Sequence, residues 1–261
     1  MYDFELVIPT TTAEATAAMK SDGAQALGGG QTLLPTMKQR LAAPEVLVKL
    51  SDLAELVGVT VQSSGLIIGG ATTHAQVASD ATAYPALAAL AGHIGDPAVR
   101  NRGTLGGSVA NNDPAACYPA AVLASGATIT TNTREISADD FFVGLFETDL
   151  EEGEIITAIK FPIPDVANYQ KFVQPASRFA LVGVFVAKFG NTVRVAVTGA
   201  SSLGVFRWTA AEDALSKTFS PSALDGLSVS ADDLMTDLHG TADYRAHLIT
   251  VLTRRAVQNC A

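Results

Sequence analysis

The chain has 261 residues, a formal net charge of −9 and an isoelectric point near 4.8. This acidic balance argues against a nucleic-acid partner, because phosphate backbones are bound by surfaces rich in Lys and Arg. No apolar run reaches the roughly 18 residues of a membrane helix. The acidic N-terminus lacks the basic-then-apolar order of a signal peptide, so we expect a cytoplasmic protein.

The residues that could bind a metal are few and unsuitably spaced. Cys117 and Cys260 alone cannot supply a four-cysteine iron–sulfur or zinc site. The four histidines show no ligand spacing to these cysteines. The sequence also shows no nucleophile with an ordered base and no carboxylate pair at catalytic spacing. We therefore expect neither a metal site nor a catalytic residue in this chain.

Apolar spacing, caps and turn residues predict mixed helices and strands up to residue 161. The helices are expected at 11–20, 31–41, 84–93 and 118–125, and the strands at 24–27, 46–50, 57–61, 66–68, 127–131 and 154–161. The sequence Ser-Ser-Gly between the third and fourth of these strands indicates a hairpin.

Two prolines, Pro162 and Pro164, then mark a domain boundary because they interrupt any regular element. Beyond them, Gly190-Asn191 predicts a hairpin between two β-branched runs. The strands are expected at 169–173, 181–189 and 192–198, and the helices at 208–217 and 242–258. We expect two α+β domains, residues 1–165 and 166–261, the first made of two α+β subdomains.

One glycine cluster lies early in the chain, where the strand at 24–27 runs into Gly28, Gly29 and Gly30. A helical pattern begins directly after it, at Gln31. A strand, a glycine turn and a helix start bring backbone N–H groups and the positive end of a helix dipole to one point. That arrangement suits a phosphate group.

A second cluster lies within residues 94–119, where Gly103, Gly106 and Gly107 alternate with Thr104 and Ser108. Glycine is required where the backbone has a positive φ or approaches another group closely. Hydroxyl and free N–H groups around such glycines can form a concave anion site. We interpret the two clusters as the two halves of one cofactor site.

Two other interpretations of the clusters exist. Gly28 and Gly30 match the first two glycines of the dinucleotide motif G-x-G-x-x-G, and Asp52 lies where a ribose ligand would be expected. However, Leu33 occupies the third glycine position, and the second cluster has no place in that motif. The phosphate-loop motif G-x-x-x-x-G-K-[ST] is absent. Both clusters could also be no more than tight turns.

The two clusters also carry a family resemblance. Residues 28–41, GGGQTLLPTMKQRL, resemble the signature A-G-G-Q-S-L-x-P-x-M-x-x-R-L, and residues 100–114, RNRGTLGGSVANNDP, resemble R-x-x-G-T-I-G-G-[NS]-x-x-x-x-D-P. Both signatures belong to the FAD-binding medium subunit of the molybdenum hydroxylases, the group of xanthine dehydrogenase and carbon monoxide dehydrogenase. Similarity continues at 154–159 and 179–184.

This resemblance implies a vanillyl-alcohol-oxidase-type (PCMH-type) FAD-binding domain followed by a small α+β domain with an antiparallel sheet and helices. Residues 27–34 would wrap the diphosphate and 104–108 would close it from the other side. Ile94 would lie near the isoalloxazine ring, Ile156 near the adenine and Lys171 near the polar edge of the ring. The residues expected to contact FAD are Leu27, Gly28, Gly29, Gly30, Gln31, Thr32, Leu33, Leu34, Thr72, His74, Ile94, Arg102, Thr104, Gly106, Gly107, Ser108, Asn111, Asp113, Cys117, Ile156 and Lys171.

The chain departs from the family pattern at two places. Cys117 occupies the position of an aspartate that binds the FAD ribose in the family, and a thiol is a poor hydrogen-bond acceptor. Residues 175–179, PASRF, stand where many relatives have R-x-G-D-F. We therefore expect weaker adenosine contacts at Cys117 and a changed charge near the flavin.

The resemblance implies an electron-transfer subunit without substrate chemistry of its own. Electrons would come from the [2Fe–2S] clusters of a small subunit, after oxidation at a molybdenum cofactor on a large subunit, and leave FAD for an external acceptor. Such subunits would form a heterotrimer, and two heterotrimers would associate as a dimer. The alternatives are a stand-alone FAD-dependent oxidoreductase of the same fold and a non-catalytic partner that has lost its flavin.

Overall fold

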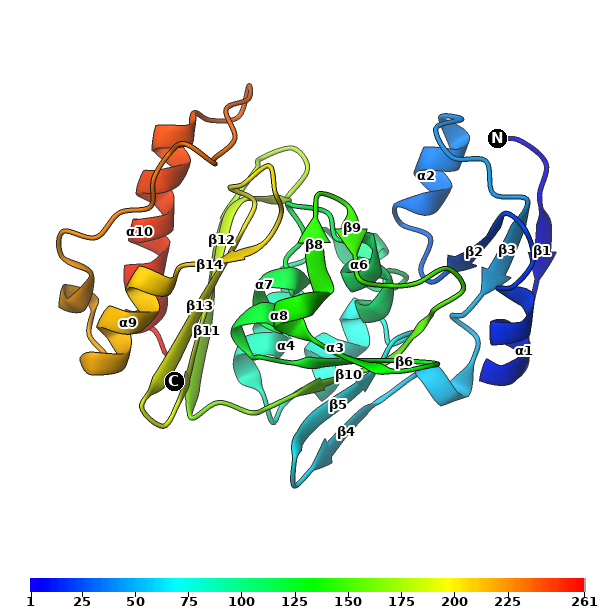
Figure 1. Cartoon of the computed structure of the whole chain (residues 1–261), viewed down its shortest axis with the longest axis horizontal. Helices are drawn as coiled ribbons and strands as arrows, with labels where there is room; N and C mark the ends of the chain where they lie inside the picture. Colours follow the sequence, from blue (N-terminus) through cyan, green and yellow to red (C-terminus); the bar gives the residue numbers. More distant parts are fainter. Residues whose placement is uncertain (261) are drawn as a thin grey trace.

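The computed structural model describes residues 1–260, which form three successive α/β layers (Figure 1). The first layer is a three-stranded parallel sheet in the order β1–β3–β2, with helices α1 and α2 and the short helix η1. Its elements are β1 (Glu5–Val7), α1 (Thr12–Ala18), β2 (Ala24–Leu27), α2 (Leu33–Lys38), β3 (Val46–Lys49) and η1 (Ala54–Leu56). Thr11 caps α1 by accepting a hydrogen bond from the N–H of Glu14.

The middle layer is a five-stranded antiparallel sheet in the order β4–β5–β10–β6–β7. Its strands are β4 (Val59–Gln62), β5 (Gly65–Gly69), β6 (Thr128–Thr131), β7 (Glu135–Ser137) and β10 (Ile156–Phe161). The accompanying elements are α3 (His74–Asp80), α4 (Pro85–Gly92), α5 (Pro97–Arg100), α6 (Leu105–Asn111), α7 (Tyr118–Ala124), α8 (Ala138–Phe141), β8 (Phe142–Gly144) and β9 (Glu147–Thr148). Buried residues of the sheet and of helices α3, α4, α6 and α7 share one hydrophobic core.

The third layer is a four-stranded antiparallel sheet in chain order. Its elements are β11 (Val166–Val173), β12 (Ala180–Phe189), β13 (Thr192–Thr198), β14 (Phe206–Arg207), α9 (Thr209–Lys217), η2 (Pro221–Leu224) and α10 (Ala242–Gln258). Residues 180–187 of β12 are all buried, because α7 covers one face of this sheet while α9 and α10 cover the other (Figure 1). A strand covered on both faces reads as a continuous apolar run, as β12 does.

The expected α+β fold class is confirmed, and each expected helix and strand has a counterpart in the structure. The division at residue 165 stays a prediction. Tyr169 and Phe185 of the third layer belong to the same core cluster as the helices of the middle layer. The two expected domains therefore share a continuous core.

The main difference concerns residues 94–119, where no helix is expected from the sequence before residue 118. The structure forms α5 and α6 there, and Gly106 and Gly107 lie inside α6. Thr104 caps α6 by accepting a hydrogen bond from the N–H of Gly107. Strand β1 and helix α3 also have no predicted counterpart.

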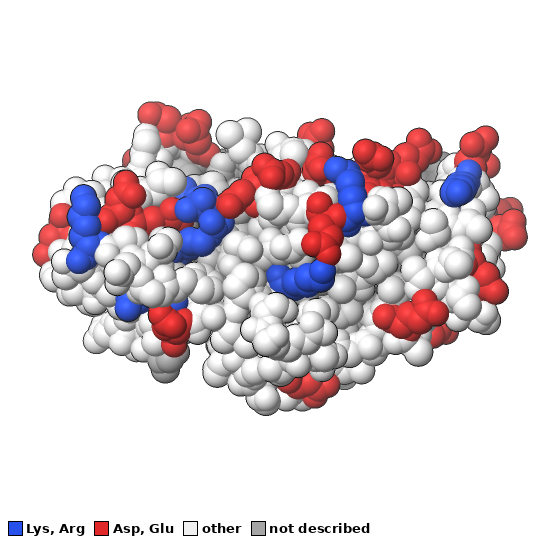
Figure 2. Space-filling view, turned by 60° about the horizontal axis from the view of Figure 1, so that its bottom comes forward, with Lys and Arg blue, Asp and Glu red and all other residues white. Residues whose placement is uncertain are grey.

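On the face drawn in Figure 2, acidic side chains gather along one margin and basic side chains lie scattered between them. This matches the negative net charge. Within residues 1–260 no helix is long and apolar enough to span a membrane. The same residues contain no cluster of His, Cys, Asp and Glu that could hold a metal ion.

Candidate cofactor site

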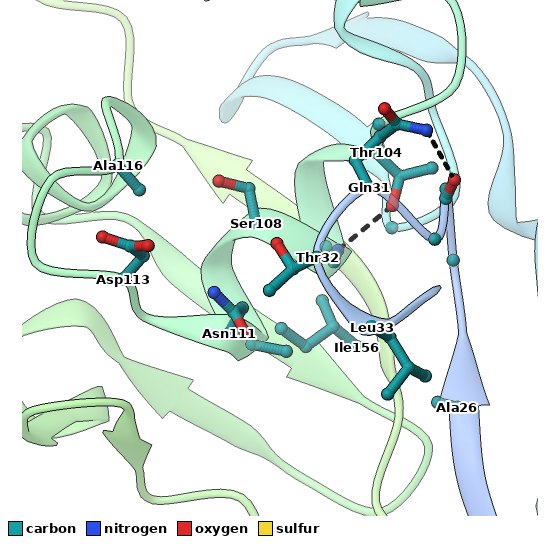
Figure 3. Close-up of a pocket in the computed structure, with 18 of the residues that line it drawn as sticks. Ala26, Gln31, Thr32, Leu33, Thr104, Ser108, Asn111, Asp113, Ala116 and Ile156 are labelled. Carbon is teal, nitrogen blue, oxygen red and sulfur yellow. Dashed lines mark hydrogen bonds between the residues drawn. The ribbon is translucent and has the colours of Figure 1, made fainter. Parts of the chain in front are cut away.

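A cavity of about 660 Å³ lies where the first layer meets the middle layer, and it extends to the edge of the third. This volume falls within the range of cofactor sites. It is lined by the end of β2 and the loop after it, by α6 and the residues around it, by residues 150–156, and by Lys171 with residues 177–179. Figure 3 shows the central part, with Gln31 and Thr32 opposite Ser108, Asn111 and Asp113.

The two glycine clusters form one side of this cavity by packing against each other. A Cβ at Gly29 would overlap the carbonyl group of Arg102, and a Cβ at Gly28 would lie 2.8 Å from the Thr104 hydroxyl oxygen. Only Gly30 of the first cluster has a positive φ, +70°. Most of these glycines are therefore required for close backbone approach rather than for an unusual conformation.

The backbone N–H groups of the two clusters have different environments. Within residues 1–260, the backbone N–H groups of residues 29–33 have no hydrogen-bond partner, and these residues line the cavity. In contrast, the N–H of Gly106 donates to the carbonyl of Gly70 (2.8 Å) and that of Gly107 donates to the Thr104 hydroxyl (3.2 Å). The N–H groups of residues 105–108 are therefore engaged within the protein, whereas those of residues 29–33 are available to an anion.

This result changes the role expected of the second cluster. Gly106 packs against the backbone of Gly70, where a Cβ would lie 2.7 Å from the carbonyl oxygen. The second cluster thus provides a close-packed surface and the Ser108 side chain, but no free N–H groups from residues 105–108. The N–H groups of residues 105–108 therefore do not contribute to the anion site expected there.

Polar side chains follow Ser108 along the cavity. Asn111 lies in α6 and Asp113 just after it (Figure 3). The Asp113 carboxylate accepts a hydrogen bond from the N–H of Ala115 (2.8 Å). Burial raises the pKa of Asp113, and this backbone hydrogen bond opposes the change.

The far end of the cavity brings Ile94, Cys117 and Lys171 together. The Lys171 ammonium donates to the carbonyl of His93 (3.0 Å) and to the sulfur of Cys117 (3.4 Å). Cys117 is buried, with 5% of its surface exposed. The hydroxyl of Tyr169 is also buried and has no hydrogen-bond partner within residues 1–260.

Seventeen of the expected contact residues line the cavity, and four do not: Leu34, Thr72, His74 and Arg102. Leu34 packs beneath Gly30, and the Arg102 carbonyl packs against Gly29. The Thr72 hydroxyl is held by the N–H and carbonyl of Gly58. These residues support the cavity from behind, and their direct contact with a cofactor stays a prediction.

His74 also lies behind the second cluster. Its backbone N–H donates to the carbonyl of Gly103 (2.9 Å), and its imidazole ring packs against the ring of Tyr118. Burial lowers the pKa of His74 to about 4, with a smaller contribution from the charge of Arg100. A neutral imidazole is therefore part of the packed structure.

Most of the loop 150–156 carries no sequence signal of a binding site, although each of its seven residues lines the cavity. Only Ile156 was expected there. Gly153, with φ +81°, allows the turn in this loop. The sequence Glu-Glu-Gly-Glu at 151–154 indicates such a turn but gives no sign of a cofactor. Phe146 also lines the cavity without a sequence signal, whereas Ser177, Arg178 and Phe179 belong to the segment 175–179 that is expected near the flavin.

The fit of this cavity to FAD follows from three features. Unpartnered N–H groups can bind a diphosphate, the glycine-rich side leaves no room for side chains, and the volume suits a large ligand. Comparison with known proteins gives the same assignment. Residues 2–164 match the family described as the FAD binding domain in molybdopterin dehydrogenase.

The similarity to curated and solved proteins extends over nearly the whole chain. The carbon monoxide dehydrogenase medium chain of Afipia carboxidovorans is 32% identical, covering 98% of this chain and 96% of that protein. The nicotine 6-hydroxylase medium subunit of Paenarthrobacter nicotinovorans is 34% identical, covering 95% and 94%. The structure of carbon monoxide dehydrogenase from Hydrogenophaga pseudoflava matches with a TM-score of 0.87 at 33% identity, covering 98% of this chain and 96% of that chain. The chain therefore belongs to the FAD-binding medium subunits of the molybdenum hydroxylases, which are oxidoreductases.

Proposed function

We propose that this chain passes electrons from the [2Fe–2S] clusters of a partner subunit, through its own FAD, to an external acceptor. The observation that carries this proposal is the row of unpartnered N–H groups at residues 29–33, which border a cavity of suitable volume. FAD supplies the redox chemistry, since it accepts and releases electrons. The chain supplies binding, orientation and exclusion of water.

The residues divide by their place along the cavity. We assign the diphosphate to the N–H groups of residues 29–33 and to the Ser108 hydroxyl. We assign the isoalloxazine ring to the end with Ile94 and Lys171, where an ammonium can donate a hydrogen bond to the polar edge of the ring. The adenosine then lies toward Ile156 and the loop 150–156.

A stand-alone oxidoreductase of the same fold is the alternative. It would need a base that faces a bound substrate. Four carboxylates line the cavity, and three of them are engaged: Asp113 accepts a backbone hydrogen bond, and Glu151 and Glu154 pair with Arg134. The fourth, Glu152, is exposed to solvent. This favours the electron-transfer subunit.

The proposed partners are a small [2Fe–2S] subunit and a large molybdenum-cofactor subunit, together forming a dimer of heterotrimers. Phe146 and Phe179 support a partner surface near the cavity. Both line it, and their exposed fractions are 56% and 46%. Exposed aromatic side chains are enriched in interfaces, which bury more than about 1,000 Å² when stable. A cytoplasmic location stays a prediction.

Purification from native extract tests this proposal. We expect the chain to copurify with two other polypeptides, iron and molybdenum, and to release FAD on denaturation. A chain that elutes alone and carries FAD would favour the stand-alone oxidoreductase. A chain without flavin, even after incubation with FAD, would contradict both functions.

A further inference from the structure

The loop 150–156 lines the cavity together with the glycine clusters, and two adjacent residues near the end of the loop attach it to different layers. Ile155 is buried in the core of the first layer together with Met19 and Leu50. Glu154, the preceding residue, is bound to the turn between β6 and β7 in the middle layer. The loop therefore bridges the two layers that enclose the cavity.

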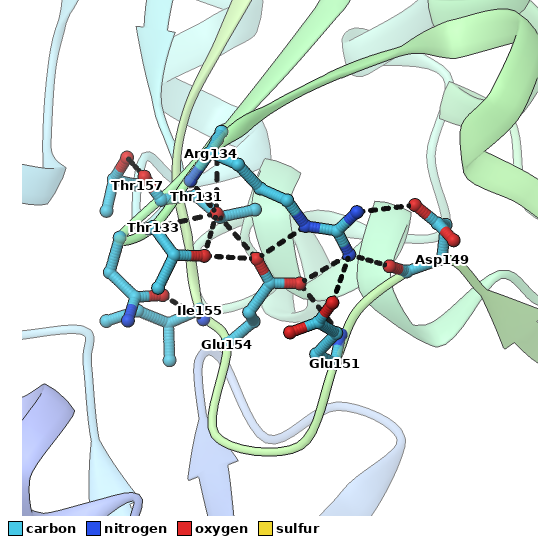
Figure 4. Close-up of polar contacts among 9 residues, drawn as sticks. Thr131, Thr133, Arg134, Asp149, Glu151, Glu154, Ile155 and Thr157 are labelled. Atoms are coloured by element: carbon cyan, nitrogen blue, oxygen red, sulfur yellow. Dashed lines mark hydrogen bonds and ion pairs between the residues drawn. The ribbon is translucent and has the colours of Figure 1, made fainter.

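The Glu154 carboxylate is the centre of this attachment (Figure 4). It is 8% exposed and pairs side-on with the Arg134 guanidinium, whose Nε and Nη2 each lie 3.0 Å from one carboxylate oxygen. It also accepts hydrogen bonds from the hydroxyls of Thr131 and Thr133 and from the N–H of Glu151. A buried carboxylate with these partners holds a fixed position.

Arg134 also balances further negative charge on the same wall. Its guanidinium lies 2.9 Å from the Asp149 carboxylate and 3.8 Å from that of Glu151 (Figure 4). Glu151 and Glu152 line the cavity. Without Arg134, this wall would present unbalanced carboxylates to the cavity, and the FAD diphosphate is itself anionic.

We propose that the Arg134–Glu154 pair is a positioning device for FAD: it holds the loop 150–156 against the adenosine half of the cofactor and offsets the charge of that wall. This inference rests on the proposed FAD site. Neither residue needs to touch the cofactor. Arg134 acts through the position of the loop and through its charge.

The test compares Arg134→Met with Arg254→Met in the purified full-length chain. Arg254 is a matched control, because it pairs with Asp225 at 2.7 Å and neither residue lines the cavity. Its side chain is 34% exposed, against 35% for Arg134. The measurements are the FAD dissociation constant and release rate by flavin fluorescence, at low and high salt, with the melting temperature of the flavin-free chain.

We expect Arg134→Met to weaken FAD binding at least tenfold at low salt and less at high salt, because salt screens the exposed carboxylates. Arg254→Met should change binding less than twofold. Arg134→Lys, which keeps the charge but loses the side-on pairing, should give an intermediate loss with little salt dependence. If Arg134→Met does not fold, the FAD affinity of Arg134→Lys tests the proposal instead.

The wild-type chain separates the two proposals. If it binds FAD and the Arg134 variants match it in affinity and release rate, the positioning role is wrong while the FAD site stands. Equal losses in the Arg134 and Arg254 variants would likewise contradict the positioning role, since they would reflect general destabilisation. A wild-type chain that binds no FAD would overturn the proposed site itself.

Discussion

The two walls of the cavity are built in opposite ways. The glycine-rich wall, residues 28–30 and 103–108, is so closely packed that a Cβ at any of its glycines would lie less than 3 Å from a neighbouring atom. At Gly29 and Gly106 that neighbour is a backbone group. The wall formed by residues 150–156 depends on a buried carboxylate and a guanidinium from a different part of the chain. The first wall should therefore be sensitive to added side-chain volume. The second should be sensitive to changes in charge.

The largest effect should come from Gly29→Ala, which tests the steric wall. The new Cβ would overlap the Arg102 carbonyl, and a backbone group cannot yield without moving one cluster away from the other. We expect at least a hundredfold loss of FAD affinity and a lower melting temperature. Gly92→Ala is the control, because its Cβ would meet only Ala78 at 4.0 Å; it should be neutral or stabilise helix α4. Equal affinity in the two variants would contradict the steric account.

A second comparison separates packing from cofactor contact within one helix. Gly106→Val would push against the backbone of Gly70, whereas Gly107→Val would meet only the Thr104 hydroxyl and the cavity. We expect Gly106→Val to destabilise the fold by about 1–3 kcal/mol or more. Gly107→Val should lose most FAD while it stays folded. The flavin content and the melting temperature of each variant distinguish loss of FAD from loss of the fold. Normal flavin content in the double variant Gly106→Val, Gly107→Val would contradict the assigned site.

Acidification should affect the two walls in different pH ranges. Burial lowers the folded-state pKa of His74 from 6.5 to about 4, so its contribution to stability is complete above 6.5 and is lost as pH falls toward 4. Burial raises the pKa of Glu154, but hydrogen bonds led by that from Arg134 lower it from 4.5 to about 2. Its contribution is complete above 4.5 and is lost toward pH 2.

Urea unfolding between pH 7.5 and 3.5 measures this difference. Glu154→Gln should lower the unfolding free energy by a constant amount above pH 5.5, on the order of 3 kcal/mol, and by less below pH 4.5. His74→Gln should instead flatten the pH dependence between 6.5 and 4. The same pH profile in both variants would show that these groups do not titrate separately.

The smallest effect concerns Cys117, at the end of the cavity beyond both walls. An aspartate there would lie beside the Lys171 ammonium and close to the Tyr169 hydroxyl. A hydrogen bond from a hydroxyl group of FAD to this carboxylate would contribute about 1.5–3 kcal/mol to binding. Repulsion between the carboxylate and the FAD diphosphate would offset part of that gain. We expect Cys117→Asp to tighten FAD binding about tenfold, with Cys117→Ser near wild type. Weaker binding and a lower melting temperature would show instead that this position belongs to the core.

The sequence predicts the two walls unequally, for a physical reason. Close backbone packing requires glycine, and a run of glycines such as 28–30 is visible in the chain. The second wall depends on Arg134 and Glu154, which are 20 positions apart, and ion pairs leave no pattern in a single sequence. Helix α6 is not predicted because glycines disfavour helices, and the burial of Leu105 and Val109 in the core stabilises it.

The central claim is that FAD binds through the N–H groups of the first cluster, and hydrogen exchange with short labelling times tests it directly. In the flavin-free chain, the amides of residues 29–33 should exchange fast, because they have no partner, and those of 105–108 slowly. Addition of FAD should slow exchange at residues 29–33 markedly and at 105–108 little. If bound FAD leaves residues 29–33 unprotected, the diphosphate is held elsewhere and the account is wrong.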